Sequence, residues 1–485
     1  MRAPLTAIFA ILALACASLL LLLSGGSYAA TPGSEEGSLF VFFFFLRAYL
    51  TQAAALSALT AALAFLLLER HHGSSSLFTR MQSSETCNVL LTAPALNKDV
   101  KLLTYNFFLR PLVKNKVSDY KELRLAYFMQ HELPKFDIIT FQEVFSTLNT
   151  RQRRLIHHAK TLGFHWKVID GGLLVLSKYP IVETDHHLFR RGTQIDGWAA
   201  KQVLYAKILL TDRTFLHLFT THAQSSYFEN ADNALNDSIR LEQMREIGEF
   251  MAKKIYGTGR EEDRKAAVVL TGDLNVDARS HRKEGEEQET EQVTIGQWGE
   301  VDGESQEYKE MVQCFEEPLL AMEEIVEEDK EGEDGDSNGE KVSLRRTQLR
   351  DLLKESYGGI HPVTINDVIM PEGDDDQQQE GEEAEKTAVR DRVRGMMPRE
   401  TVFTNECDYL ARESKDYIFF FDERQDYGQE KGEKLVVDVK TTQVEPFFVD
   451  RSLVASSSSS PHFPCTQLSD HYGASAVLRV EPFFS

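Results

Sequence analysis

Short apolar runs separated by polar segments dominate the chain from Val100 onward. Most of these runs are four to eight residues long and rich in Val, Ile, Phe and Tyr, which favours strands over helices. Two intervening segments, 117–131 and 238–255, carry apolar residues at helical spacing. The alternation predicts an α/β protein, with strands at 101–105, 136–141, 172–177, 203–210, 214–221, 266–272 and 416–421.

Two longer apolar stretches precede this region. Residues 5–23 and 48–68 contain 19 and 21 residues without a charge, and a bilayer-spanning helix takes roughly 20 residues. Arg2 precedes the first stretch and Arg70 follows the second, so the positive-inside rule predicts a hairpin of two transmembrane helices with the remaining chain in the cytosol. The alternative is that the first stretch is a signal peptide, cleaved after Ala29.

The negative charge of the chain is concentrated in one region. The net charge is −22, and residues 281–390 hold 33 acidic and 11 basic residues, a net of −22, so the rest of the chain is neutral. Residues 281–342 and 371–389 are acidic with little apolar content, which predicts a disordered insert. The part at 284–340 should be dispensable for folding, because it has too little apolar surface to offset the entropy of ordering it. The piece at 344–370 has a more structured pattern.

Several predicted strands end in a polar residue of catalytic type. If strands of one sheet end together, these residues lie along one edge of the sheet. There, carboxylates can bind Mg²⁺, amide and imidazole N–H groups can donate to phosphate oxygens, and a histidine can act as a base. The five cysteines lack metal-ligand spacing, so no zinc site is predicted. The residues concerned are Asn106, Glu143, His222, Asp273 and Asn275, with Asp470 and His471 just before a last apolar run.

The order of motifs along the chain, N…QEV…SKYPI…THxQ…GDLNV…DYI…SDH, resembles the endonuclease/exonuclease/phosphatase (DNase-I-like) superfamily. QEVF at 142–145, DGGLLVLSKYPI at 170–181 and THAQ at 221–224 are similar to neutral and bacterial sphingomyelinases in particular. The resemblance covers residues 100–280 and about 343–480. It implies a four-layered α/β/β/α sandwich, preceded here by the two transmembrane helices.

The resemblance also implies a metal site and a regulatory loop. Glu143, with Asn106 and help from Asp470, would bind Mg²⁺, or Mn²⁺ in its place. Asp196 followed five residues later by Lys201 has the spacing of the family's regulatory loop. In the family a glycine usually follows the lysine, whereas Gln202 stands here, which leaves the geometry of this loop open.

The remaining implied roles concern water and phosphate. Asp273 would hold the attacking water, Asn275 and His222 would donate to phosphate oxygens, and His471 would be the general base. Such a base needs its second nitrogen held. Asp416 is the candidate for this, preferred over Asp408 because the apolar run Ile-Phe-Phe-Phe follows closely.

These features predict a phosphodiesterase that hydrolyses sphingomyelin, or a related phosphosphingolipid, to ceramide and a phosphorylated headgroup. The expected organisation is a membrane anchor at 1–70 and a catalytic domain at 98–482, facing the cytosol, with a membrane sphingolipid as substrate. A nuclease of the same superfamily would need a basic surface, and no nucleic acid partner is expected. An inositol-polyphosphate phosphatase would carry a tryptophan before GDxN and a Cys-Asp-Arg segment, both missing here. A non-catalytic membrane scaffold is the remaining alternative.

Overall fold

The structure of the chain is a computed structural model. It describes residues 99–110, 120–146, 149–193, 196–198, 200–226, 233–280, 303–333, 348–366, 412–422, 432–449 and 467–483. The two predicted spans and the second acidic stretch at 371–389 lie outside these residues. From Asp99 onward, the described helices include none with both the length and the apolar character needed to cross a bilayer.

The first large sheet has the strand order β13-β15-β1-β2-β4-β3, with β14 paired to β15. β1 and β2 are parallel, while β15 runs antiparallel to β1. The predicted runs at 101–105, 136–141 and 172–177 fall in this sheet, as β1, β2 and β4. Its strands are β1 (Asp99–Leu109), β2 (Ile138–Val144), β3 (Trp166–Asp170), β4 (Leu173–Ser177), β13 (Gly432–Val437), β14 (Gln443–Glu445) and β15 (Gly473–Phe483).

The second large sheet has the order β5-β6-β7-β8-β12-β9. β7 and β8 are parallel, and β12 runs antiparallel to β8. The other four predicted runs lie here as β6, β7, β8 and β12, so all seven strand predictions are confirmed. Its strands are β5 (Ile181–Leu188), β6 (Gln202–Leu209), β7 (Phe215–His222), β8 (Ala267–Asp273), β9 (Gln348–Asp351) and β12 (Asp416–Asp422).

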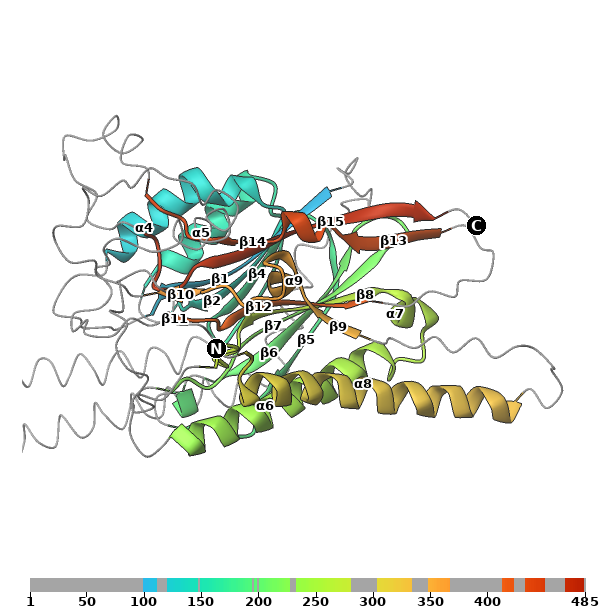
Figure 1. Cartoon of the computed structure of the whole chain (residues 1–485). Coiled ribbons are helices and arrows are strands. Elements are labelled where there is room, and N and C mark those ends of the chain that lie inside the picture. The colour runs from blue at the N-terminus through green and yellow to red at the C-terminus, as the bar shows by residue number, and fades with distance from the viewer. Residues whose placement is uncertain are drawn as a thin grey trace, which may run out of the picture. The chain divides into compact units, whose positions relative to one another are not determined.

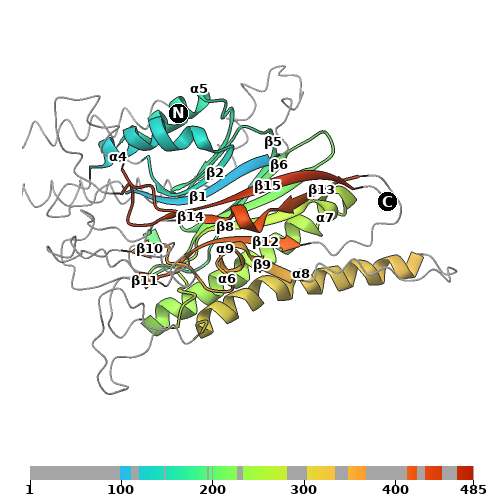
Figure 2. The ribbon, with the colours of Figure 1, turned by 45° about the horizontal axis from the view of Figure 1, so that its top comes forward.

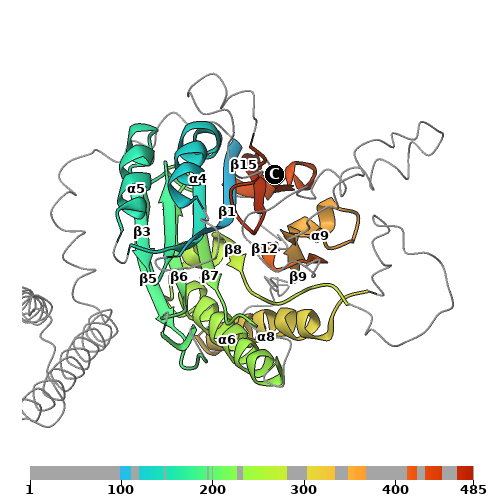
Figure 3. The same cartoon turned by 90° about the vertical axis from the view of Figure 1, so that its left-hand side faces the viewer.

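The two sheets face each other, and helices cover their outer faces (Figures 1 and 2). α4 (Lys121–Tyr127) and α5 (Arg151–Thr161) lie on the first sheet, while α6 (Asn233–Ile255) and α8 (Gln306–Glu333) lie on the second (Figure 3). This α/β sandwich agrees with the expected arrangement of helices and sheets. The short elements are the helical turns η1 (Phe128–Glu132), η2 (Leu133–Lys135), η3 (Asp196–Trp198) and η5 (Val439–Thr441), the helices α7 (Glu261–Lys265) and α9 (Leu352–Ser356), and the strand pair β10 (Ile365–Asn366) and β11 (Arg412–Glu413).

Hydroxyl and amide groups bridge the interior between the sheets. Thr140 on β2 lies 2.9 Å from Thr271 on β8, hydroxyl to hydroxyl. The Gln142 amide donates to the Thr220 hydroxyl of β7 at 3.2 Å. All four side chains are fully buried, and such bonds have little competition from water. These directed contacts fix how β2 lies against β7 and β8.

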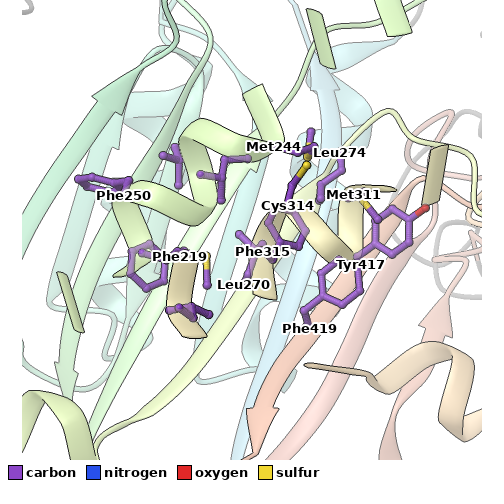
Figure 4. Packing of buried hydrophobic residues seen from close by; sticks show 14 of the residues in the cluster. Phe219, Met244, Phe250, Leu270, Leu274, Met311, Cys314, Phe315, Tyr417 and Phe419 are labelled. Carbon is purple, nitrogen blue, oxygen red and sulfur yellow. The ribbon is translucent and has the colours of Figure 1, made fainter. Parts of the chain in front are cut away.

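The acidic insert is ordered in part, which corrects the sequence-based prediction. α8 covers residues 306–333 of the stretch expected to be disordered, and Met311 and Phe315 are fully buried against the second sheet together with residues of α6 (Figure 4). Burying such a side chain contributes about 1.5–3 kcal/mol. Tyr308, Met311, Phe315 and Leu319 recur every three or four positions, a helical face that the overall acidity had masked.

Candidate active site

The predicted site residues gather at one end of the sandwich, but they come from both sheets rather than from the rim of one. The Asn106 amide on β1 donates to Oδ2 of Asp273 on β8 at 3.0 Å, across the sheet interface. The parallel pairs β1/β2 and β7/β8 end at this place, and β12 and β15 begin there. The first sheet supplies Asn106, Glu143, Asp470 and His471, and the second supplies His222, Asp273, Asn275 and Asp416.

The His471 imidazole is held between two carboxylates. Its Nδ1 lies 2.8 Å from Oδ2 of Asp416, and its Nε2 lies 3.6 Å from Oδ2 of Asp273. Burial lowers the pKa of His471, but the Asp416 and Asp273 carboxylates outweigh it and raise the pKa to about 10. With Nδ1 donating to Asp416, Nε2 is the atom that exchanges a proton with the site.

Asp273 is the centre of the hydrogen-bond network. It is 1% exposed, its Oδ1 accepts from the Asn275 backbone N–H at 3.0 Å, and its Oδ2 lies 3.4 Å from Nε2 of His222. Burial opposes ionisation of Asp273, yet His471 and His222 lower its pKa to about 2. Burial and the nearby Lys201 lower the pKa of His222 to about 4. Near neutral pH, Asp273 is therefore a carboxylate and His222 is neutral.

Unusual backbone conformations orient the side chains of the site. Glu143 and Asn275 have φ of 59° and 55°, a region that residues other than glycine rarely adopt and that is common at functional sites. Gly272 has φ of 136°, and a Cβ there would lie 2.1 Å from the Thr221 carbonyl oxygen. Only glycine lets β8 approach β7 so closely just before Asp273.

Glu143 suits a metal ligand. Its side chain is 13% exposed, and among the described residues its Oε2 has no hydrogen-bond partner. Burial raises its pKa to about 7, with Arg110 opposing and Asp470 adding to the rise. A buried carboxylate oxygen without a hydrogen bond is costly, and a hard divalent cation satisfies it. Asn106, whose Oδ1 accepts from the Phe108 backbone N–H at 3.2 Å, is the neutral oxygen ligand expected beside it.

A second cluster of side chains could also hold a metal. Asp273, Asp416 and His471 place ligand atoms within 4.8 Å of one another. However, the bond between His471 and Asp416 occupies one oxygen of Asp416 and one nitrogen of His471. We therefore interpret these three residues as a proton-handling group.

The Asp196 and Lys201 side chains form an ion pair. Lys201 Nζ lies 3.2 Å from Asp196 Oδ1, and the two side chains are 6% and 4% exposed. Lys201 Nζ also donates to the Ala223 carbonyl oxygen, which accepts from the Asn275 amide as well. Gln202, where a glycine was expected, begins β6 and does not prevent this pairing. The loop is thereby tied to the residues beside His222.

Three residues that contact the site were given no role from the sequence, although Ser469 belongs to the SDH motif. Arg110 lies 3.4 Å from Glu143, and its position just after the strand that carries Asn106 was the available signal. Ser469 donates to the Asn106 carbonyl oxygen at 2.6 Å and accepts from the His471 backbone N–H at 3.3 Å. The Thr364 hydroxyl accepts from the Asp416 backbone N–H at 3.1 Å, and no local motif marks it.

Comparisons with known proteins find similar sequences and structures. Residues 104–290 match the endonuclease/exonuclease/phosphatase family. The chain is similar to a sphingomyelinase of Dictyostelium discoideum, with 29% identity over 81% of this chain and 81% of that protein. It is also similar to a sphingomyelinase C of Listeria ivanovii, with 29% identity over 29% of this chain and 45% of that protein. This match therefore spans less than half the length of the bacterial relative.

Solved structures that match this chain include a sphingomyelinase C and a beta toxin. Sphingomyelinase C from Streptomyces griseocarneus has 19% sequence identity and a TM-score of 0.40, and the match covers 78% of this chain and 99% of that one. A Staphylococcus aureus beta toxin with bound magnesium ions has 18% identity and a TM-score of 0.40, with the same coverage.

Proposed function

We propose that this chain, a sphingomyelinase-type member of the endonuclease/exonuclease/phosphatase family, is a hydrolase that cleaves sphingomyelin or a related phosphosphingolipid. The products would be ceramide and a phosphorylated headgroup. The similarity to sphingomyelinases supports this substrate class. The observation that carries the proposal is His471, whose Nδ1 bonds to Asp416 and whose Nε2 faces Asp273.

The family uses a divalent cation, and we assign Mg²⁺ to Glu143, Asn106 and Asp470. Glu143 offers a buried carboxylate oxygen without a hydrogen-bond partner among the described residues. Asp470 lies close enough to raise the pKa of Glu143, as a second acidic ligand would. When bound, the cation stabilises negative charge on the phosphoryl oxygens and on the leaving oxygen.

The other side chains handle water, phosphate and protons. Asp273, ionised at neutral pH, accepts a hydrogen bond from the attacking water and orients it toward phosphorus. Only the neutral form of His471 can remove the proton from this water through Nε2, and its raised pKa makes that form the minor one near neutral pH. Asp416 holds Nδ1 and stabilises the positive charge that the imidazole acquires. His222 and Asn275 donate to phosphate oxygens. The water oxygen bonds to phosphorus and the bond from phosphorus to the ceramide oxygen breaks. The ceramide oxygen takes up a proton from solvent water, to which the His471 imidazolium returns the proton that it gained.

One assay separates this proposal from its alternatives. The purified chain, with Mg²⁺ or with EDTA, is offered sphingomyelin, ceramide phosphoinositol, phosphatidylcholine and abasic DNA. We expect Mg²⁺-dependent release of the phosphorylated headgroup from a sphingolipid and no cleavage of DNA. Preferred cleavage of abasic DNA would favour a nuclease, and inactivity on every substrate would favour a scaffold.

A further inference from the structure

Arg110 interacts with Glu143, the proposed metal ligand. It follows the end of β1, and its Nε lies 3.4 Å from Oε2 of Glu143. Neither atom has a hydrogen-bond partner among the described residues. The two side chains therefore attract each other by charge, without the directed bond that would lock them together.

The two members of this ion pair differ in how easily they can move. Glu143 lies at the end of the buried strand β2 and is 13% exposed, whereas the Arg110 side chain is 34% exposed. The Arg110 guanidinium lies 3.9 Å above the Phe108 ring, so a flat apolar surface supports it on one side. A long side chain at the protein surface can rotate away, while the short Glu143 side chain stays with its strand.

Lys201, a second cation that acts on Glu143, is not mobile in this way. Its Nζ contacts both Asp196 and the Ala223 carbonyl oxygen, and its side chain is only 6% exposed. Arg110 is thus the cation near Glu143 that can leave without breaking another described hydrogen bond.

A divalent cation and a guanidinium cannot both lie against Glu143 Oε2 without strong repulsion, because both are positive and the site is shielded from water. We propose that Arg110 and the divalent cation compete for Glu143, and that the displaced Arg110 guanidinium becomes a binding group for the substrate phosphate. This inference rests on the proposed function for the identity of the anion. The competition itself requires only that Glu143 binds the metal. A guanidinium is well suited to bind phosphate oxygens in pairs.

The competition is tested by metal binding, without an activity assay. The EDTA-treated full chain is titrated with Mn²⁺, and free Mn²⁺ is measured by electron paramagnetic resonance. Arg110→Gln should bind Mn²⁺ roughly three- to tenfold more tightly than the wild type, because a competing charge is lost. Arg110→Lys keeps the charge and should stay close to the wild type. Equal or weaker binding by Arg110→Gln would overturn the competition.

The matched control is Arg479→Gln. Arg479 has a similar exposure of 38% and pairs with Asp99, at the far end of β1, so its loss should leave Mn²⁺ binding unchanged. Circular dichroism spectra check that all variants are folded.

The anion-binding step has its own measurement. At saturating Mn²⁺, inorganic phosphate is titrated into the protein by calorimetry. Arg110→Gln should bind phosphate several-fold more weakly than the wild type, even though it binds Mn²⁺ more tightly. Unchanged phosphate affinity would overturn this second role. Neither titration measures turnover. If the wild type proved inactive, that result would contradict the proposed function, but the Mn²⁺ and phosphate affinities could still be compared between variants.

Discussion

His471 combines a fixed orientation with a changeable charge. Asp416 fixes its Nδ1, and Asp416 and Asp273 together favour the imidazolium. The water-binding and proton-accepting groups are therefore parts of one electrostatic unit. Replacing one of them changes the protonation of the others as well as the contacts of the residue removed.

Replacing His471 should separate base catalysis from metal binding. His471→Ala should lower turnover on sphingomyelin by about 10²- to 10⁴-fold, the range for loss of a general base, while Mn²⁺ binding persists. Glu143→Gln should lose activity that high Mg²⁺ partly restores, because it weakens the metal site. Asp416→Asn should resemble His471→Ala, with a smaller or equal loss. Near-normal activity of His471→Ala, or equal rescue of it by Mg²⁺, would refute the assignment.

His222 should make the metal-free protein sensitive to acid. Its pKa in the folded chain is about 4, below the ordinary 6.5, so as pH falls from about 6.5 to 4 the unfolded chain takes up the proton first and stability drops. The shift corresponds to about 3 kcal/mol at most. Glu143 has the opposite effect on stability. Its pKa is raised to about 7 in the folded chain, so as pH falls the folded chain takes up this proton first and gains stability.

The test is therefore the difference between the wild type and His222→Gln. Guanidinium unfolding in EDTA at pH 7.5 and pH 4.5 should show the wild type losing more stability than the variant. An identical pH dependence of the two proteins would contradict the shifted pKa.

At the scale of elements, α6 ties the loop that carries Asp196 to the active site. The Gln243 side chain, fully buried on α6, accepts from the Gln224 backbone N–H at 2.9 Å and donates to the Arg191 carbonyl oxygen at 2.8 Å. Asp196 in turn accepts from the Ser225 backbone N–H at 2.7 Å. The segment after β5 and the segment after β7 are thus joined by directed bonds.

Asp196 and Lys201 should act as one unit on turnover. Lys201→Ala and Asp196→Ala should each lower turnover, and the double variant should lose less than the sum of the two, because each single change already breaks the pair. The measurement is a double-mutant cycle on kcat and on the free energy of unfolding. Strict additivity in kcat would show that the two residues act independently.

The contact between α6 and α8 allows a test of the ordered part of the acidic insert. A Cβ at Gly248 would lie 2.2 Å from the Cys314 carbonyl oxygen of α8. Gly248→Ala should therefore push the helices apart and lower the free energy of unfolding by about 1–3 kcal/mol. The neighbouring exposed Glu249→Ala is the control and should change it by less than about 0.5 kcal/mol. Equal stability of both variants in guanidinium unfolding would contradict the packing of α8.

At the scale of the whole molecule, the membrane topology remains a prediction from charge. Arg2 and Arg70 flank the outer ends of the two apolar stretches, so we expect the domain that follows to face the cytosol. Protease added to sealed vesicles with the cytosolic face outward should digest this domain. Full protection together with loss of residues 1–29 would instead indicate a signal peptide and a lumenal enzyme.

The sequence alone determined the strands and the chemical types at their ends. The run at 416–421 is recognisable because strand formation follows local apolar and β-branched content. The GDLNV motif places Asp273 at the end of a strand and Asn275 just after it, whichever sheet that strand joins. The family resemblance added roles for Glu143 and His471. It also supported the choice of Asp416, which the structure places 2.8 Å from His471.

Only the tertiary structure decided which sheet each strand joins, and hence that the site lies between two sheets. Asn106 and Asp273 are 167 positions apart, and no local pattern reports a contact at that separation. The same holds for Arg110, whose role depends on its distance from Glu143, and for α8, whose apolar face has meaning only against α6 and the second sheet. Local periodicity depends only on residues that are close in the sequence. Which distant strand ends come together depends on how the layers of helices and sheets pack.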